Sequence, residues 1–175
     1  MVSSAINTWA VFRFALGYPD ERHLERFREL CDGTPGTLEE LRALYIDLFE
    51  AGLPQPRCPL LESAWLLNRP AGEVVLENKL YYKAFGLEID GRAAPDHLLT
   101  QLEFLAWMDH CLAAGNADPE SLERGRFQFL ERHMAHWVGS LARLAENSGG
   151  GCYAELLEAL ATEVESAQGR QVADF

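Results

Sequence analysis

The sequence predicts an all-α protein, a single helical, bundle-like domain over residues 1–175 with about seven helices. Three observations predict this class. Apolar residues recur at spacings of three and four along most of the chain, which is the period of one face of a helix. No segment of the sequence shows the sustained alternation of apolar and polar residues that is typical of a half-buried strand. Capping residues, glycines and prolines stand where the helical periodicity starts and stops.

The first three expected helices lie before residue 50. Apolar residues from Ile6 to Phe14 form one face of the first helix. Asp20 can cap a second helix, which we expect to stop near Gly33. Thr37, followed three residues later by Glu40, forms a capping box that opens the third.

Four more helices are expected after residue 70. The first covers residues 71–85, and the segment Pro95–Leu112 forms a strongly apolar second. Asp118, followed by a proline, opens a third whose apolar residues keep helical spacing as far as Leu144. The last helix follows the glycine-rich stretch 148–151.

Two long loops separate these helices. The loop 52–61 contains three prolines, which cannot continue a helix, and the loop 86–95 is polar. Ordered long loops between helices often carry function. We therefore expect these two loops to be functional.

The composition favours a soluble protein that binds basic partners. Lys and Arg number 15 against 27 Asp and Glu, a net charge of −12, which disfavours nucleic acid and anionic lipid. The simpler interpretation is that the acidic surface only keeps the protein soluble. No segment has the ~18–20 apolar residues of a membrane span, and the first residues lack the basic region of a secretory signal. We expect a cytoplasmic protein that does not insert into membranes, with reduced, buried cysteines.

Signals for catalysis or metal binding are weak. His133 and His136 are spaced to lie near each other on a helix, but no further ligands stand at helical spacing. The sequence has no glycine-rich phosphate loop and no Gly-x-Ser-x-Gly motif. Asp96 and His97 are adjacent on a helix and so point about 100° apart, which does not suit an acid–base pair. We expect no catalytic residue, no metal and no cofactor.

A polar stripe follows the start of the helix that opens at Pro95. Asp96, Thr100, Glu103 and His110 share one face of this otherwise apolar helix. Two interpretations stay open. The stripe is an N-cap with a hydrogen-bonded seam between helices, or it is a set of acceptors for a cationic group of a partner.

Aromatic residues near the first loop also allow two interpretations. Tyr45, Leu48 and Phe49 lie at spacings of three and four, which suits core packing. Their position just before the proline-rich loop would also suit the wall of an apolar groove, to which Trp65 could contribute.

Three blocks in this order resemble a known family. They are an aromatic-x-x-Leu-Phe block at Tyr45, Leu48 and Phe49, a Pro-x-x-Glu-Ser-x-aromatic block at Pro59, Glu62, Ser63 and Trp65, and a Pro-Asp-His-Leu block at Pro95 to Leu98 that leads into Leu102 to Leu105. Together they resemble the TorD/DmsD/NarJ family of chaperones for molybdenum-containing redox enzymes. Some members carry a Glu where Ala93 or Ala94 stands here, which favours the NarJ-like side of the family or a divergent branch.

The resemblance implies a cytoplasmic, non-enzymatic chaperone. Its client would be the catalytic subunit of a molybdenum-containing oxidoreductase, bound at its N-terminal twin-arginine signal or as the apo-protein. The chaperone would assist cofactor insertion and delay export. Carboxylates would bind the arginines, and an apolar groove would take the rest of the segment. The residues expected to bind the partner are Tyr45, Leu48, Phe49, Glu62, Trp65, Pro95, Asp96, His97 and Glu103.

Other functions stay open at this point. One is a NarJ-like assembly factor that acts on the apo-subunit without any role in export. Another is a small helical enzyme or nucleotide-binding protein, and a third is an adaptor bundle with no redox-enzyme client. The sequence allows either a monomer or a domain-swapped dimer.

Overall fold

The computed structural model describes residues 7–31, 34–115 and 118–172, and it confirms the all-α class. The described residues form eight α-helices. These are α1 (Thr8–Ala15), α2 (Glu21–Leu30), α3 (Leu38–Phe49), α4 (Ala71–Ala84), α5 (Leu98–Ala114), α6 (Pro119–Phe129), α7 (Val138–Asn147) and α8 (Cys152–Val172). A short 3₁₀ turn, Glu62–Ala64, lies between α3 and α4, and a π-helical turn, Leu130–Met134, follows α6.

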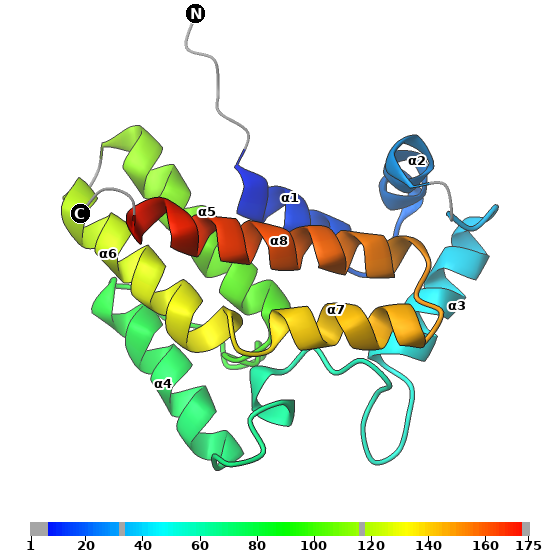
Figure 1. Cartoon of the computed structure of the whole chain (residues 1–175), viewed down its shortest axis with the longest axis horizontal. Coiled ribbons are helices and arrows are strands. Elements are labelled where there is room, and N and C mark those ends of the chain that lie inside the picture. Colours follow the sequence, from blue (N-terminus) through cyan, green and yellow to red (C-terminus); the bar gives the residue numbers. More distant parts are fainter. Residues whose placement is uncertain (1–6, 32–33, 116–117, 173–175) are drawn as a thin grey trace, which may run out of the picture.

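The long C-terminal helix α8 runs across the bundle and packs against α1, α6 and α7 (Figure 1). Helix α7 packs alongside α8, and α1 lies against both α5 and α8. Helices α4, α5 and α6 form one end of the molecule, and α2 and α3 form the other. The loop between α3 and α4 passes below α7 in this view and brings the 3₁₀ turn into contact with α4.

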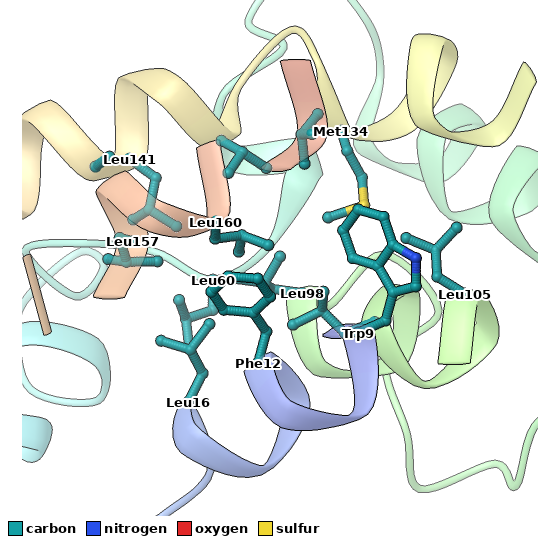
Figure 2. Packing of buried hydrophobic residues seen from close by; sticks show 14 of the residues in the cluster. Trp9, Phe12, Leu16, Leu60, Leu98, Leu105, Met134, Leu141, Leu157 and Leu160 are labelled. Atoms are coloured by element: carbon teal, nitrogen blue, oxygen red, sulfur yellow. The ribbon is translucent and has the colours of Figure 1, made fainter. Parts of the chain in front are cut away.

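A single apolar core joins these helices (Figure 2). Its members come from most elements, including the first long loop. They include Trp9, Phe12 and Leu16 of α1, Leu60 of the loop, Leu98 and Leu105 of α5, Met134, Leu141 of α7, and Leu157 and Leu160 of α8. All of them are 9% exposed or less, and burial of each such side chain stabilises the fold by about 1.5–3 kcal/mol.

The local signals placed most helix starts correctly. Asp20 caps α2, and the Thr37 hydroxyl accepts a hydrogen bond from the Glu40 backbone N–H at 3.2 Å, as the capping box predicts. Asp118 caps α6 through the backbone N–H of Ser121. Such a cap contributes about 1 kcal/mol. The stop expected near Gly33 lies outside the described residues.

The prediction of a single long helix from Asp118 to Leu144 is wrong, because α6 ends at Phe129 and α7 begins only at Val138. The backbone N–H of Ala135 donates to the carbonyl of Leu130, a five-residue bond that marks the π-helical turn. Trp137 leaves helical geometry, with φ −136°, and its indole N–H donates to the carbonyl of His133 at 2.6 Å. The side chain therefore satisfies a backbone acceptor that the break leaves open.

We expect Gly125→Ala to destabilise the fold, although alanine favours a helix more than glycine does. A Cβ atom at this position of α6 would lie 2.2 Å from the ring of Phe85. Overpacking costs about 1–3 kcal/mol, which outweighs the gain of about 1 kcal/mol in helix propensity. Urea unfolding would measure the difference.

The matched control for this substitution is Gly72→Ala in α4, where no atom lies within 4 Å of the added Cβ. This variant should be as stable as the parent or more stable. Adding Phe85→Leu should restore part of the stability lost in Gly125→Ala. Equal stability of the two alanine variants would contradict the close packing of Phe85.

Candidate functional site

The two long loops meet in space. Leu61 and His97 form an isolated antiparallel bridge, and the backbone N–H of Glu62 donates to the carbonyl of Asp96 at 2.9 Å. The Asp96 carboxylate accepts the backbone N–H of Ser63 at 3.2 Å. The Glu-Ser and Pro-Asp-His blocks, 33 residues apart in the sequence, therefore form one structural unit, which we call the loop unit.

A buried polar cluster fixes this unit to the bundle. The Glu62 cluster consists of Glu62, Asn78 of α4, Gln101 of α5 and His133 of the π-helical turn, and all four side chains are fully buried. Asn78 Nδ2 and Gln101 Nε2 donate to Glu62 Oε2 at 2.8 and 2.7 Å. His133 Nδ1 lies 3.1 Å from both carboxylate oxygens. One carboxylate therefore joins four separate elements.

Tyr82 extends the cluster to the second loop. Its hydroxyl donates to the carbonyl of Pro95 at 2.7 Å and lies 3.3 Å from Asn78 Oδ1. Burial raises the pKa of Tyr82 above its usual range, so the hydroxyl stays protonated and remains a donor. Within the described residues, His133 Nε2 and Gln101 Oε1 are buried without a hydrogen-bond partner. The hydrogen bonds of Tyr82 and of the Glu62 cluster hold the two loops against α4 and α5.

The structure separates the carboxylates proposed to bind a cationic group. Glu62 is 0% exposed and Asp96 is 2% exposed, so neither reaches solvent while the loops stay packed. The carboxylate of Glu103 is open, with 67% of its side chain exposed, and it pairs with Arg13 at 3.4 Å. For Asp96, the interpretation as a hydrogen-bonded seam agrees with the structure.

The expected N-cap of α5 is shifted by one residue. Asp96 does not cap the helix, because its carboxylate is turned to Ser63. His97 is the N-cap, and its Nδ1 accepts the backbone N–H of Leu99 at 3.2 Å. Burial lowers the pKa of His97, which keeps the ring neutral and Nδ1 free to accept. Pro95 is also buried.

The aromatic block of α3 belongs to the core. Tyr45, Leu48 and Phe49 are at most 5% exposed. The rings of Tyr45 and Phe49 pack edge to face against Tyr153 of α8, and burial raises the pKa of Tyr45 to about 12. The core interpretation is therefore confirmed, and a role of these residues in partner binding stays a prediction.

Trp65 lies partly buried at the end of the 3₁₀ turn. Its indole N–H donates to the carbonyl of Pro59 at 3.0 Å, and its ring stacks on Trp137. It therefore closes the proline-rich loop onto the helix break. Its role in binding a partner also stays a prediction.

A large opening that sequence reasoning missed lies between α1, α2 and α8. This α1–α2–α8 groove has a volume of about 740 Å³, in the range of ligand-binding pockets. It is lined by apolar side chains from all three helices and by a few polar ones. The apolar residues are Ala10, Val11, Phe14, Ala15, Phe27, Cys31, Leu156 and Ala159, and the polar ones are Asn7, His23, Arg26 and Glu155. Val11, which lines the groove, is half exposed in the structure, and no local sequence pattern marks it.

A local network holds α2 in place as one wall of the groove. The ring of His23 stacks on Phe14 at 4.2 Å, and its Nε2 donates to the Phe14 carbonyl at 2.8 Å. Asp20 accepts hydrogen bonds from the backbone N–H groups of Arg22 and His23. The start of α2 is therefore joined to the end of α1, and the groove wall has a defined position.

We expect Asp20→Asn to flatten the pH dependence of stability in acid. The Arg22 guanidinium and the His23 side chain hold the pKa of the Asp20 carboxyl well below its usual range. Because the folded-state pKa is depressed, the carboxylate contributes stability above about pH 4, and this contribution is lost as the pH falls towards the folded-state pKa. Asparagine keeps the cap without titrating.

Thermal unfolding between pH 6 and pH 2, followed by circular dichroism, would test this prediction. The melting temperature of the parent should fall more steeply below pH 4 than that of Asp20→Asn. Identical acid limbs for the two proteins would contradict the assigned role of the carboxylate.

The described residues contain no group of three or more His, Cys, Asp or Glu side chains that could hold a metal ion. None of the described helices has both the length and the apolar character that a membrane span requires.

The fold and the site together define an all-helical protein with a loop unit fixed by buried polar groups and an apolar groove between helices. A family model described as nitrate reductase delta subunit matches residues 15–143. The chain is 34% identical over 162 residues to the selenate reductase assembly chaperone protein of Thauera selenatis, covering 87% of this chain and 82% of that protein. It is also 34% identical over 128 residues to the chlorate reductase assembly chaperone protein of Ideonella dechloratans, covering 69% of this chain and 66% of that protein.

The fold agrees with these relatives. A crystal structure of a redox enzyme maturation protein from Archaeoglobus fulgidus superposes with a TM-score of 0.61 at 22% identity, covering 94% of this chain and 97% of that one. The chain therefore belongs to the nitrate reductase delta subunit family of redox-enzyme maturation chaperones, as the sequence blocks predict. These relatives are named as assembly chaperones and not as enzymes.

Proposed function

We propose that this protein is a chaperone for the catalytic subunit of a molybdenum-containing oxidoreductase, which it binds in the cytoplasm before cofactor insertion is complete. The observation that carries this proposal is the similarity to assembly chaperones of selenate and chlorate reductases over most of the chain. A third relative is named for dimethyl sulfide dehydrogenase. The clients of these proteins differ, so the similarity supports the kind of client rather than its substrate.

The α1–α2–α8 groove is the place where we propose that the client binds. Its lining is mostly apolar, and Val11 lies half exposed within it. An apolar segment of an unfolded or partly folded client would bury its side chains there, and this burial would supply most of the affinity. The α3 residues predicted from the sequence to bind the partner are buried in the core, whereas the lining of the groove is accessible.

The acidic surface of the chaperone would favour client segments that carry basic residues. The net charge of −12 attracts basic chain ends, and Glu155 in the groove lining would set orientation and selectivity more than affinity. A twin-arginine signal combines two guanidinium groups with an apolar stretch and fits this description. Binding of such a signal would delay export until the cofactor is inserted.

A second candidate function is assembly of the apo-subunit without any role in export. Two observations favour it. The family model that matches residues 15–143 is that of the nitrate reductase delta subunit, and Ala93 and Ala94 stand where some members carry a Glu. In this case the chaperone would bind the apo-subunit itself.

Calorimetry would test both functions. The purified protein would be titrated with a peptide of about the first 40 residues of the candidate catalytic subunit, and separately with the apo-subunit. Micromolar or tighter binding of the peptide, about −8 kcal/mol, would support recognition of the N-terminal segment. Binding of the apo-subunit alone would support the assembly function. Binding of neither would contradict the chaperone proposal for that client.

A further inference from the structure

Another, smaller pocket lies between α5 and the loop that follows α4. This α5 pocket has a volume of about 310 Å³, which suits one side chain better than a chain segment. Apolar side chains form most of its surface, and carboxylates stand among them. The lining residues are Tyr82, Leu87, Glu88, Ile89, Asp90, Ala93, Thr100, Glu103, Phe104 and Trp107.

Aromatic rings form part of the pocket lining. Phe104 and Trp107 lie one turn apart on α5, with nearly parallel rings whose centroids are 6.2 Å apart. The ring of Tyr82 fixes Phe104 from the side at 4.9 Å. Phe104 is buried, whereas Trp107 is only partly so. Trp107 can therefore offer part of its ring to a bound group.

Three carboxylates belong to the same pocket. Glu88, Asp90 and Glu103 are all exposed. Within the described residues, Glu103 is the one of the three in an ion pair, with Arg13 at 3.4 Å, and both side chains of that pair are about half exposed or more. Exposed pairs of this kind are weak, so an incoming cation can displace Arg13. The carboxylates leave the pocket with excess negative charge.

We propose that the α5 pocket binds one arginine side chain of the client, an inference that rests on the proposed chaperone function. A guanidinium group is planar, so it can stack on Trp107 while its edge donates to the carboxylates. An ammonium group lacks the flat face, which favours arginine over lysine. An aromatic surface beside carboxylates fits a cation and disfavours an anion or a purely apolar group.

The position of the pocket fits the same client segment. Val11 of α1 lines the groove, and Arg13, two residues later, pairs with Glu103 of the α5 pocket. Residues two apart on a helix point about 200° apart, so α1 contacts the groove and Glu103 of the α5 pocket through different faces. A segment whose apolar part fills the groove can cross α1 and place a neighbouring arginine in the pocket.

The pocket can be tested without the client. The chain would be labelled with ¹⁵N in its tryptophans, and the indole signal of Trp107 would be assigned through Trp107→Phe. Titration with N-acetyl-arginine methylamide should shift this signal, whereas the uncharged citrulline analogue should leave it in place. Glu103→Gln should weaken the response at least threefold, and Glu120→Gln, an exposed carboxylate of α6, should not. An unmoved Trp107 signal, or equal shifts with arginine and citrulline, would overturn the proposal.

A double-mutant cycle would then connect the pocket to the client. If the client peptide binds, replacing its arginines one at a time by glutamine should weaken binding, and one of these changes should have no effect in Glu103→Gln. Additive losses at every arginine would overturn the assignment of the pocket while leaving the chaperone function intact. A peptide that fails to bind, combined with a positive arginine titration, would contradict the client and not the pocket.

Discussion

Replacing Glu62 by alanine is expected to lower the free energy of unfolding by about 3 kcal/mol or more, because each buried polar group left without its hydrogen-bond partner costs about 1–3 kcal/mol. The substitution removes the acceptor shared by Asn78, Gln101 and His133, which are all fully buried. Their N–H groups would be left unsatisfied away from water, which is costly. The loop unit that carries Glu62 would also lose its anchor to α4, α5 and the helix break.

Urea unfolding followed by fluorescence and circular dichroism would measure this loss. The matched control is Glu120→Ala in α6, whose side chain is 85% exposed and should change stability by less than about 0.5 kcal/mol. Glu62→Gln keeps one acceptor oxygen, so it should lose less and serves as the measurement if the alanine variant does not fold. A loss below about 1 kcal/mol in Glu62→Ala would contradict the central role of the cluster.

The helices could be predicted from the sequence largely because their signals are local. Thr37 and Glu40 lie three residues apart and satisfy each other's backbone N–H groups, whatever the rest of the chain does. The break after Phe129 has no such signal. It turns His133 towards Glu62, 71 residues away, while the apolar spacing on both sides of the break stays helical.

In the candidate site, too, local sequence signals identify residues, whereas contacts between distant segments decide their environment. The sequence predicts Glu62 and Asp96 as carboxylates that could bind a cationic group of the partner, because charged residues are seldom fully buried, whereas the structure buries both. Their burial depends on partners in other elements, such as Gln101, which lies 39 residues from Glu62. The α1–α2–α8 groove depends on how α8 docks against α1 and α2, more than 100 residues earlier, and no local pattern encodes that.

Val11→Glu is expected to weaken binding of the client segment at least tenfold, about 1.4 kcal/mol, with little change in the stability of the chaperone. Val11 is 50% exposed at the groove, so a glutamate can reach water in the free protein. In the complex the same carboxylate would be covered by apolar side chains of the client and would lose that hydration, which is unfavourable. The effect should therefore appear in binding and not in folding.

The matched control is Leu67→Glu, at an exposed apolar residue between the 3₁₀ turn and α4 that does not line the groove. It introduces the same charge and should leave the calorimetric affinity unchanged, which separates a local effect from the added negative charge. Melting temperatures of both variants should lie close to that of the parent. If the client binds the parent tightly and Val11→Glu equally well, the client does not occupy the groove, and the loop unit around Trp65 becomes the next place to test.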